Sequence, residues 1–270
     1  MKYIAIGGGG FKAYTYVGAL KKVDLNKVKA VSGSSAGSII GFFICLTKKY
    51  DKIEEIAVDK QNRIFESNDI DIHNFLPFYG LNTGENIEKK LEKLCEIHCG
   101  MKRPTFKEFV EKTEVDFYVS TTNLSKRTCE YFCNKTTPEF DVIRAIRMSI
   151  SIPLYFTPIE YNGDTYIDGS FFKPIPYDIL LENYDDICRE NGMMIGSKEC
   201  DRLSEHTNFT EYVSNIFHLI RKGLVIKSGD EKKFVVVRID TSEYPFVEHK
   251  CNDEMIVNMI EHGANSIDIK

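Results

Sequence analysis

The sequence predicts an α/β protein whose central sheet is mainly parallel. Short apolar segments at residues 2–6 and 28–31 each run into glycines or serines, and residues with helical spacing follow both. This β-α-β-α order predicts parallel strands, because antiparallel neighbours need no crossover helix. The loops that follow the two strands are therefore expected to meet at the carboxyl edge of the sheet.

The later elements are predicted from periodicity, capping residues and turn residues. Thr105 and Glu108 form a capping box that begins a short helix, and Asn162-Gly163 predicts a hairpin turn. No internal repeat or linker is evident, so residues 1–270 are expected to form one domain. The other expected helices are 51–65, 85–99, 138–150 with Pro138 near its start, and 209–225, and the other expected strands are 115–121, 128–132, 159–161, 165–167 and 234–239.

Composition excludes several classes of protein. The chain has 270 residues, 43% of them hydrophobic and 28% charged, which is not the composition of a disordered protein. Its net charge of -5 does not indicate nucleic-acid binding. The start of the chain lacks the apolar core of a signal peptide, so a cytoplasmic location is expected. The longest apolar stretch, 39–46, is much shorter than the roughly 20 residues that span a bilayer, so any membrane contact is expected to be peripheral.

One group of cysteines resembles part of a metal site. Cys95, His98 and Cys99 lie close together, but no second cluster at zinc-ligand spacing follows. The eight cysteines are therefore interpreted as reduced thiols, and no metal is expected.

The second strand leads into a possible nucleophile elbow. Gly33-Ser34-Ser35-Ala36-Gly37 fits the G-x-S-x-G pattern and lies between a predicted strand and a predicted helix, as that motif requires. Small residues suit the tight turn, which presents the Ser35 hydroxyl above the sheet. An ordinary glycine-serine turn is the alternative.

The glycines after the first strand form an anion-binding candidate. Gly7 to Gly10 expose backbone N–H groups at the start of a helix, which can hold a phosphate or an oxyanion. The spacing of Gly8, Gly10 and Ala13 also resembles a dinucleotide fingerprint. That fingerprint needs an acidic residue at the end of the next strand, where this chain has serine and glycine. An oxyanion site is therefore favoured, and no cofactor is expected.

Asp168-Gly169 follows the second strand of the predicted hairpin. Alone, this dipeptide is more often a turn than part of a catalytic site. A glycine loop, a G-x-S-x-G elbow and a distant Asp-Gly pair, in this order, together resemble the patatin-like phospholipase family. The similarity covers roughly residues 1–178 and includes 79–81, 105–106, 145–149, 152–153 and 156–158.

The resemblance implies a patatin-like three-layer fold, with helices on both faces of the sheet, and specific roles for the motif residues. Ser35 falls on the family's nucleophile and Asp168 on its catalytic aspartate. The N–H groups of Gly9, Gly10 and Phe11 would form the oxyanion hole. Supporting positions are Gly8, Lys12, Gly33, Gly37 and Gly169. The chain departs from the family pattern at Ala13, Ser170 and Pro174.

The implied activity is release of fatty acids from phospholipids or lysophospholipids by a Ser-Asp dyad, without a cofactor. An acyl chain needs an apolar channel, for which the candidates are Phe42, Phe43, Leu76, Phe78 and Phe156, although core packing explains most of them better. The apolar stripe of the predicted 209–225 helix could contact lipid, but packing on the sheet is favoured.

Two other functions fit parts of the pattern. A Ser-His-Asp esterase acting on soluble esters would need a histidine after Asp168. His206, His218, His249 and His262 lie there, none of them in a distinctive motif. A catalytically silent module that binds lipid or a partner is the other alternative, and the intact Ser35 and Asp168 argue against it.

Overall fold

The computed structural model describes residues 1–64, 70–198, 212–213, 215–216, 219, 229–245 and 252–267. The strands are β1 (Tyr3–Ile6), β2 (Ala30–Ser34), β3 (Gly80–Asn82), β4 (Asp116–Asn123), β5 (Thr128–Cys133), β6 (Leu154–Phe156), β7 (Ile159–Tyr161), β8 (Asp164–Ile167), β9 (Gly192–Ser197) and β10 (Val235–Ile239). The α-helices are α1 (Tyr14–Ala19), α2 (Ala36–Thr47), α3 (Tyr50–Val58), α4 (Phe75–Phe78), α5 (Glu85–Cys99), α6 (Phe106–Thr113), α7 (Val142–Ser149), α8 (Asp178–Asn183) and α10 (Asp253–Asn265). Short 3₁₀ helices include η1 (Gly10–Ala13), η3 (Ile72–Asn74) and η4 (Gly169–Phe171).

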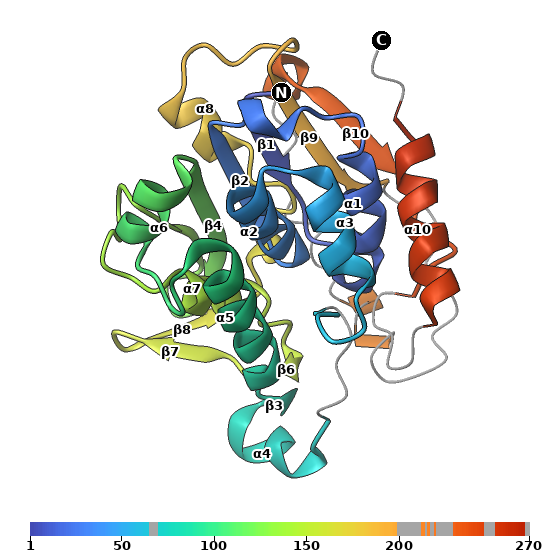
Figure 1. The fold of residues 1–270 in the computed structure, drawn as a ribbon. Helices are drawn as coiled ribbons and strands as arrows, with labels where there is room; N and C mark the ends of the chain where they lie inside the picture. The colour runs from blue at the N-terminus through green and yellow to red at the C-terminus, as the bar shows by residue number, and fades with distance from the viewer. Residues whose placement is uncertain are drawn as a thin grey trace.

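The strands form a large mixed sheet in the order β10-β9-β1-β2-β4-β8-β7, with β5 also paired to β4 (Figure 1). The pairs from β10 through β4 are parallel, whereas β5, β7 and β8 pair antiparallel. The prediction of a mainly parallel central sheet is confirmed. β3 and β6 make a separate parallel pair.

Side chains alternate between two cores along the central strands. Ile4 and Ile6 face a large cluster that includes residues of α1, α2, α5, α7 and α10. Tyr3 and Ala5 face a smaller cluster on the opposite side, which includes Leu180 of α8. A strand that is buried on both faces is typical of a sheet covered by helices on both sides. The three-layer arrangement is therefore confirmed.

The C-terminal third completes the sheet beside β1. β9 pairs with β1 in parallel, and β10 pairs with β9. Helix α10 lies beside α1 (Figure 1). Their backbones touch at two glycines, since a Cβ atom at Gly18 would lie 1.8 Å from the Ile260 carbonyl oxygen and one at Gly263 would lie 1.8 Å from the Thr15 carbonyl oxygen. The sequence predicted β10 but neither β9 nor α10.

Several predicted boundaries were wrong. The helix expected at 51–65 ends at Val58, because Asp59 is extended and its side chain caps the turn that follows. The helix expected from Pro138 starts only after Asp141, whose carboxylate accepts the Arg144 N–H at 2.9 Å. The second strand runs to Ser34, so the first half of the elbow motif belongs to the strand.

Other predicted elements are present. The capping box of Thr105 and Glu108 is formed, and Asn162 and Gly163 both have positive φ in the turn between β7 and β8. Most of the helix expected at 209–225 lies outside the described residues, although residues 212, 213, 215, 216 and 219 are helical. No helix of the described chain is both long and apolar enough to cross a membrane.

Candidate active site

Ser35 lies at the sharp turn between β2 and α2. Its backbone has φ 52° and ψ -129°, a conformation that L-amino acids rarely adopt. The turn is held by Ser38, whose N–H and hydroxyl both donate to the Ser35 carbonyl oxygen, at 2.8 and 2.6 Å. Ser35 is therefore held in a strained turn directly before the N-terminus of a twelve-residue helix.

The two glycines of the motif are required by close backbone approaches. A Cβ atom at Gly33 would lie 2.5 Å from the Ser38 Cα atom, and one at Gly37 would lie 2.3 Å from the Ile6 carbonyl oxygen. Any larger residue would push α2 away from β1 or from the end of β2. The G-x-S-x-G spacing thus reflects how closely α2 packs under the turn.

The structure brings Ser35 and Asp168 together across the sheet. The Ser35 hydroxyl donates to Asp168 Oδ2 at 2.5 Å, and the two residues are 133 positions apart in sequence. Both are buried, with 3% and 2% of their surfaces exposed. The other carboxylate oxygen, Oδ1, accepts from the Ser170 N–H at 2.9 Å and from the Ser170 hydroxyl. Ser170, a departure from the family pattern, therefore adds a donor to this carboxylate.

Buried polar groups hold the backbone around both residues. The Ser35 N–H donates to Ser149 Oγ at 2.9 Å, and Ser149 donates to the Ser120 carbonyl at 2.7 Å. On the other side, the Asp168 N–H donates to the Ser151 carbonyl at 2.9 Å. The Thr122 hydroxyl donates to the Asp168 carbonyl at 2.9 Å. Each of these bonds lies in the interior, where an unmade hydrogen bond costs about 1–3 kcal/mol.

Arg147 is fully buried and is linked to Asp168 through Ser151. Its guanidinium donates to the Ser151 hydroxyl at 2.7 Å and to the carbonyl oxygens of Thr83 and Thr157 at 2.8 to 2.9 Å. Burial lowers the pKa of Arg147 to about 10, because desolvation disfavours the charged form. The cation thus joins β3 and the loop after β6 to Ser151, the residue that holds the Asp168 N–H.

The glycine loop after β1 lies against the same two residues. A Cβ atom at Gly8 would be 3.1 Å from the Ser35 Cβ atom and 2.8 Å from the Ser170 Cβ atom. The Gly8 N–H donates to the Pro174 carbonyl at 3.1 Å, so Pro174 takes part in bracing the loop. Gly10 has φ 54°, the left-handed conformation that favours glycine.

The rest of the glycine loop leaves N–H groups available. Among hydrogen bonds between described residues, none uses the N–H of Gly9 or Gly10. Phe11 is buried, and its ring packs edge-on against that of Tyr14. Lys12 is half-buried, and its N–H donates to the Gly9 carbonyl.

Tyr16 of α1 supports the loop from behind. Its hydroxyl donates to the Gly8 carbonyl at 3.0 Å and lies 2.7 Å from the Ser197 hydroxyl, to which Thr241 donates at 3.2 Å. The same hydroxyl would be only 2.7 Å from a Cβ atom at Gly9, so a side chain there would collide with it. Thr241, Ser197 and Tyr16 thus form a chain of hydroxyls that begins two residues after β10 and reaches the glycine loop.

Other candidate groups lie elsewhere. Cys95 and Cys99 are buried in α5, and burial raises the pKa of the Cys95 thiol to about 12. No group of three or more possible metal ligands is arranged around one point within the described ranges. His262 Nδ1 lies 3.3 Å from the Tyr244 hydroxyl and 3.0 Å from Glu243, whereas His206, His218 and His249 lie outside the described residues.

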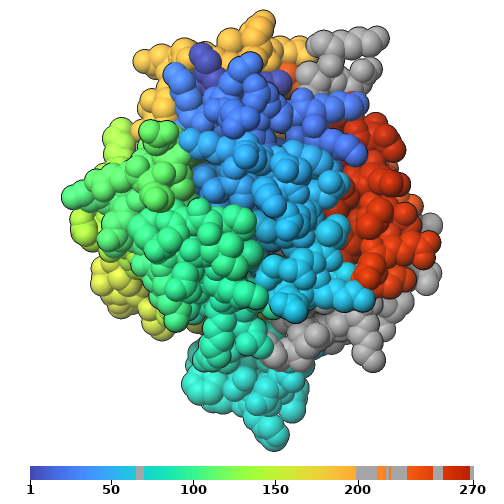
Figure 2. All heavy atoms as spheres, in the orientation of Figure 1, coloured from blue at the N-terminus to red at the C-terminus, as the bar shows by residue number. Residues whose placement is uncertain are grey.

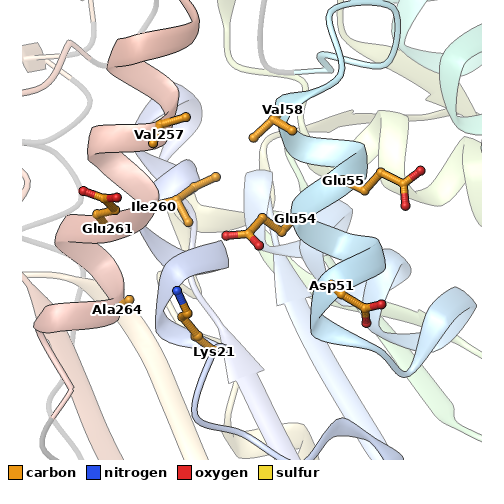
Figure 3. A pocket seen from close by; sticks show the side chains of 9 residues that line it. All are labelled: Lys21, Asp51, Glu54, Glu55, Val58, Val257, Ile260, Glu261 and Ala264. Atoms are coloured by element: carbon orange, nitrogen blue, oxygen red, sulfur yellow. The ribbon is translucent and has the colours of Figure 1, made fainter.

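A separate surface pocket of about 350 Å³ lies between α3 and α10, next to the end of α1 (Figure 3). Glu54 points towards Lys21 and α10, whereas Asp51 and Glu55 point away from them. The described residues that line it supply carboxylates and one amine, but no hydroxyl, thiol or imidazole. The described lining of this pocket therefore offers no serine or cysteine nucleophile and no histidine base for ester hydrolysis.

The candidates for an acyl channel divide into two groups. Phe42, Phe43 and Phe156 are buried in the core. Leu76 and Phe78 are exposed, so core packing does not describe them.

The sequence also missed residues that support the site. Arg147 and Ser149 lie in a segment that carried the family resemblance. Helical spacing alone does not show that Arg147 is buried whereas Arg144 is half-buried beside Glu88. Ser197 and Thr241 had no local signal, because their role depends on strands that come together only in the folded sheet.

Comparisons with known proteins identify the family of the chain. The family model of patatin-like phospholipases matches residues 4–181. The chain is 31% identical to "Probable lipid hydrolase 463L" of Invertebrate iridescent virus 6 over 227 residues, which is 80% of this chain and 73% of that protein. It is 29% identical to an uncharacterized protein of Acanthamoeba polyphaga mimivirus over 255 residues, 89% of this chain and 84% of that protein.

Solved structures share the fold at low sequence identity. VipD from Legionella pneumophila superposes with a TM-score of 0.59 at 16% identity, over 98% of this chain. ExoU from Pseudomonas aeruginosa, in its complex with SpcU, superposes with a TM-score of 0.51 at 14% identity. The chain spans only 65% of the VipD chain and 52% of the ExoU chain.

Proposed function

Because the chain belongs to the patatin-like phospholipase family, we propose that it is a lipid acyl hydrolase that releases fatty acids from glycerophospholipids. In this proposal Ser35 is the nucleophile and Asp168 the general base. The observation that carries it is the 2.5 Å hydrogen bond from the Ser35 hydroxyl to Asp168 Oδ2 in a buried site. The name of the viral relative, a lipid hydrolase, supports a lipid substrate.

The first half of the reaction follows from the direction of that hydrogen bond. As Ser35 Oγ bonds to the ester carbonyl carbon, its proton passes to Asp168 Oδ2 and the carbonyl oxygen becomes an oxyanion. Carboxylates are weak bases for alcohols, so proton transfer and bond formation must occur together. When the tetrahedral intermediate collapses, the carbon–oxygen bond to the lysolipid breaks, and Asp168 returns the proton to the departing oxygen.

The second half uses the same groups with water. Asp168 accepts a proton from a water molecule, whose oxygen attacks the acyl carbon attached to Ser35. Collapse of the second intermediate releases the fatty acid and returns a proton to Ser35 Oγ. The acyl enzyme thus divides one difficult displacement into two steps.

The oxyanion requires donors close to the reacting carbonyl, and the glycine loop is suited to supply them. Gly8 lies against Ser35, and the N–H groups of Gly9, Gly10 and Phe11 follow it directly. The N-terminus of α2, immediately after Ser35, also favours negative charge. Removal of one such donor in other hydrolases costs about 3 kcal/mol of transition-state stabilisation.

The proposal is tested by removal of the Ser35 hydroxyl, with its neighbour as the control. Ser35→Ala should lower fatty-acid release from phospholipid and lysophospholipid by at least about 10⁴-fold and abolish labelling by a fluorophosphonate. Ser34→Ala is the matched control, because Ser34 Oγ is buried and makes no hydrogen bond to a described residue. Its activity and labelling should stay close to those of the wild type. Labelling that persists in Ser35→Ala, together with retained activity, would refute the proposal.

A further inference from the structure

Residues 70–79 form a projection that we name the apolar tip. It comprises η3 and α4, followed by Tyr79, and it extends from the body of the molecule beyond β3 (Figures 1 and 2). None of the residues in η3 or α4 is buried. The apolar tip therefore contributes little to the core, although most of its residues are hydrophobic.

Large apolar side chains are concentrated on the apolar tip. Of the fourteen that are exposed among the described residues, five lie within these ten positions and nine are spread over the rest of the chain. Their exposed fractions are 45% for Ile70, 68% for Ile72, 82% for Leu76, 56% for Phe78 and 69% for Tyr79. Exposed apolar surface is costly in water, and such a concentration is typical of an interaction site.

The apolar tip is held by backbone and capping bonds instead of by burial. The Asp71 N–H donates to the Leu81 carbonyl at 2.8 Å, and the Asp71 carboxylate accepts the His73 N–H at 2.9 Å. The helix then ends at Tyr79, which has the left-handed φ of 57°. These bonds define the shape of the segment while its apolar side chains remain directed to the outside.

The charges of the apolar tip indicate which surface it fits. Residues 70–79 contain no lysine or arginine, and Asp71 is their only carboxylate. Proteins that dock on anionic membranes use clusters of basic residues. Apolar side chains with a tyrosine at their edge are suited instead to the boundary between headgroups and acyl chains. We propose that the apolar tip inserts into an electrically neutral lipid surface, such as a phosphatidylcholine bilayer.

This inference rests on the proposed function, since a hydrolase of membrane lipids must take its substrate from such a surface. The apolar tip continues into β3, and Gly80 pairs with Leu154 of β6, a further exposed apolar residue. Thr83, one residue beyond β3, accepts from Arg147, which donates to Ser151 beside Asp168. Lipid bound at the apolar tip would therefore lie beside a segment that is connected to Asp168 through Arg147 and Ser151.

The test compares two double variants, each of which replaces two exposed apolar side chains by serine. Leu76→Ser with Phe78→Ser removes two apolar side chains from the apolar tip. Leu124→Ser with Ile97→Ser removes two from other exposed positions, where 51% and 61% of the side chains are exposed. Binding is measured by co-sedimentation with phosphatidylcholine vesicles, in the Ser35→Ala background so that no lipid is consumed. Thermal melting checks that each variant is folded.

The variant of the apolar tip should bind vesicles at least about tenfold more weakly, because each inserted leucine or phenylalanine contributes roughly that factor. The control should bind as the parent does. Addition of anionic phosphatidylglycerol should not strengthen binding. With Ser35 restored, the variant should lose hydrolysis of vesicle lipid but keep hydrolysis of a dispersed short-chain ester.

Different results separate this inference from the proposed function. Equal vesicle binding by both double variants would overturn the proposal that the apolar tip inserts into lipid. A wild type that sediments as a dimer, and becomes a monomer when the apolar tip is changed, would show a self-association surface and would also overturn it. A third result would separate the two proposals. If the wild type hydrolysed neither the vesicle lipid nor the short-chain ester, but the Leu76→Ser, Phe78→Ser variant still lost vesicle binding, the hydrolase would be refuted and the docking surface would be supported.

Discussion

The proposed nucleophile and base, Ser35 and Asp168, differ from the glycine loop in which parts of the chain hold them. Ser35 and Asp168 are held by Ser149, Ser151 and Thr122, all within the segment that matches the family model. The glycine loop is held from both inside and outside that segment, since the Gly8 N–H donates to the Pro174 carbonyl at 3.1 Å and the Gly7 N–H to the Ile195 carbonyl at 2.9 Å. The proposed catalytic pair is thus supported from within the matched segment, whereas the loop proposed to stabilise charge depends in part on the C-terminal third.

This difference suggests what the C-terminal third contributes. β9 and β10 extend the sheet beside β1, and α10 packs backbone to backbone on α1, the helix that follows the glycine loop. The third carries neither proposed catalytic residue. We expect it to act by positioning the donors of the glycine loop, so changes there should lower turnover without removing the proposed nucleophile.

The largest effect should come from Asp168. We expect Asp168→Asn to lower hydrolysis by about 10³- to 10⁴-fold, because the amide cannot accept the Ser35 proton. Changing each of the six histidines in turn to glutamine should have little effect, since a dyad uses no imidazole. The measurement is fatty-acid release, with folding followed by thermal melting. A folded histidine variant as inactive as Ser35→Ala, beside an active Asp168→Asn, would establish the Ser-His-Asp esterase instead.

An intermediate effect is expected at Arg147, the buried cation behind Asp168. Arg147→Met leaves the Thr83 and Thr157 carbonyls without this donor and removes the bond to Ser151. Turnover should fall about 10- to 100-fold, with KM little changed, because small displacements of a catalytic group have effects of this size. Thermal melting should show lower stability, by a few kcal/mol.

Arg147→Lys separates a positioning role from a general loss of stability. Burial lowers the pKa of Arg147 to about 10, so wild-type arginine keeps its charge through the neutral range. The pKa of a free lysine is about 10.4, which is below that of a free arginine, and the same burial would lower the pKa of the lysine further. The lysine variant should therefore be most active at lower pH and lose turnover as pH rises towards 9, where the wild type is unaffected. Parallel pH profiles for the two proteins would exclude this role for the charge.

The sequence predicts the positions of Ser35 and Asp168 in the fold well, because the signals for these positions are local. A strained turn between strand and helix needs small residues at Gly33 and Gly37, and the hairpin before Asp168 needs Asn162-Gly163. These requirements appear as short motifs. They led to the placement of Ser35 at the end of a parallel strand, which the structure confirms.

The remaining parts depend on contacts between distant segments. β9 has two glycines and two methionines in six residues, so its strand propensity is weak, and its pairing with β1 and β10 determines its structure. α10 meets α1 through Gly18 and Gly263, which are 245 positions apart and carry no helical signal. Leu76 and Phe78 lie in a projecting segment, which hydrophobicity alone cannot identify.

The smallest effect should come from Tyr16, the first link between the C-terminal third and the glycine loop. Tyr16→Phe keeps the ring in the core but removes the hydroxyl that donates to the Gly8 carbonyl and contacts Ser197. A single hydrogen bond contributes about 0.5–1.5 kcal/mol, which corresponds to roughly a two- to tenfold loss. The loss should fall on kcat and spare KM, because the oxyanion exists only beyond the ground state.

Tyr50→Phe is the matched control for this change. It removes a tyrosine hydroxyl of similar type, which donates to Glu54 at 2.8 Å within α3 and does not contact the glycine loop. We expect it to leave kcat unchanged. Ser197→Ala should resemble Tyr16→Phe, since both interrupt the hydroxyl chain that starts at Thr241. If Tyr16→Phe and Tyr50→Phe gave the same kcat, the glycine loop would hold its shape without the C-terminal third, and the contrast between the two supports would be wrong.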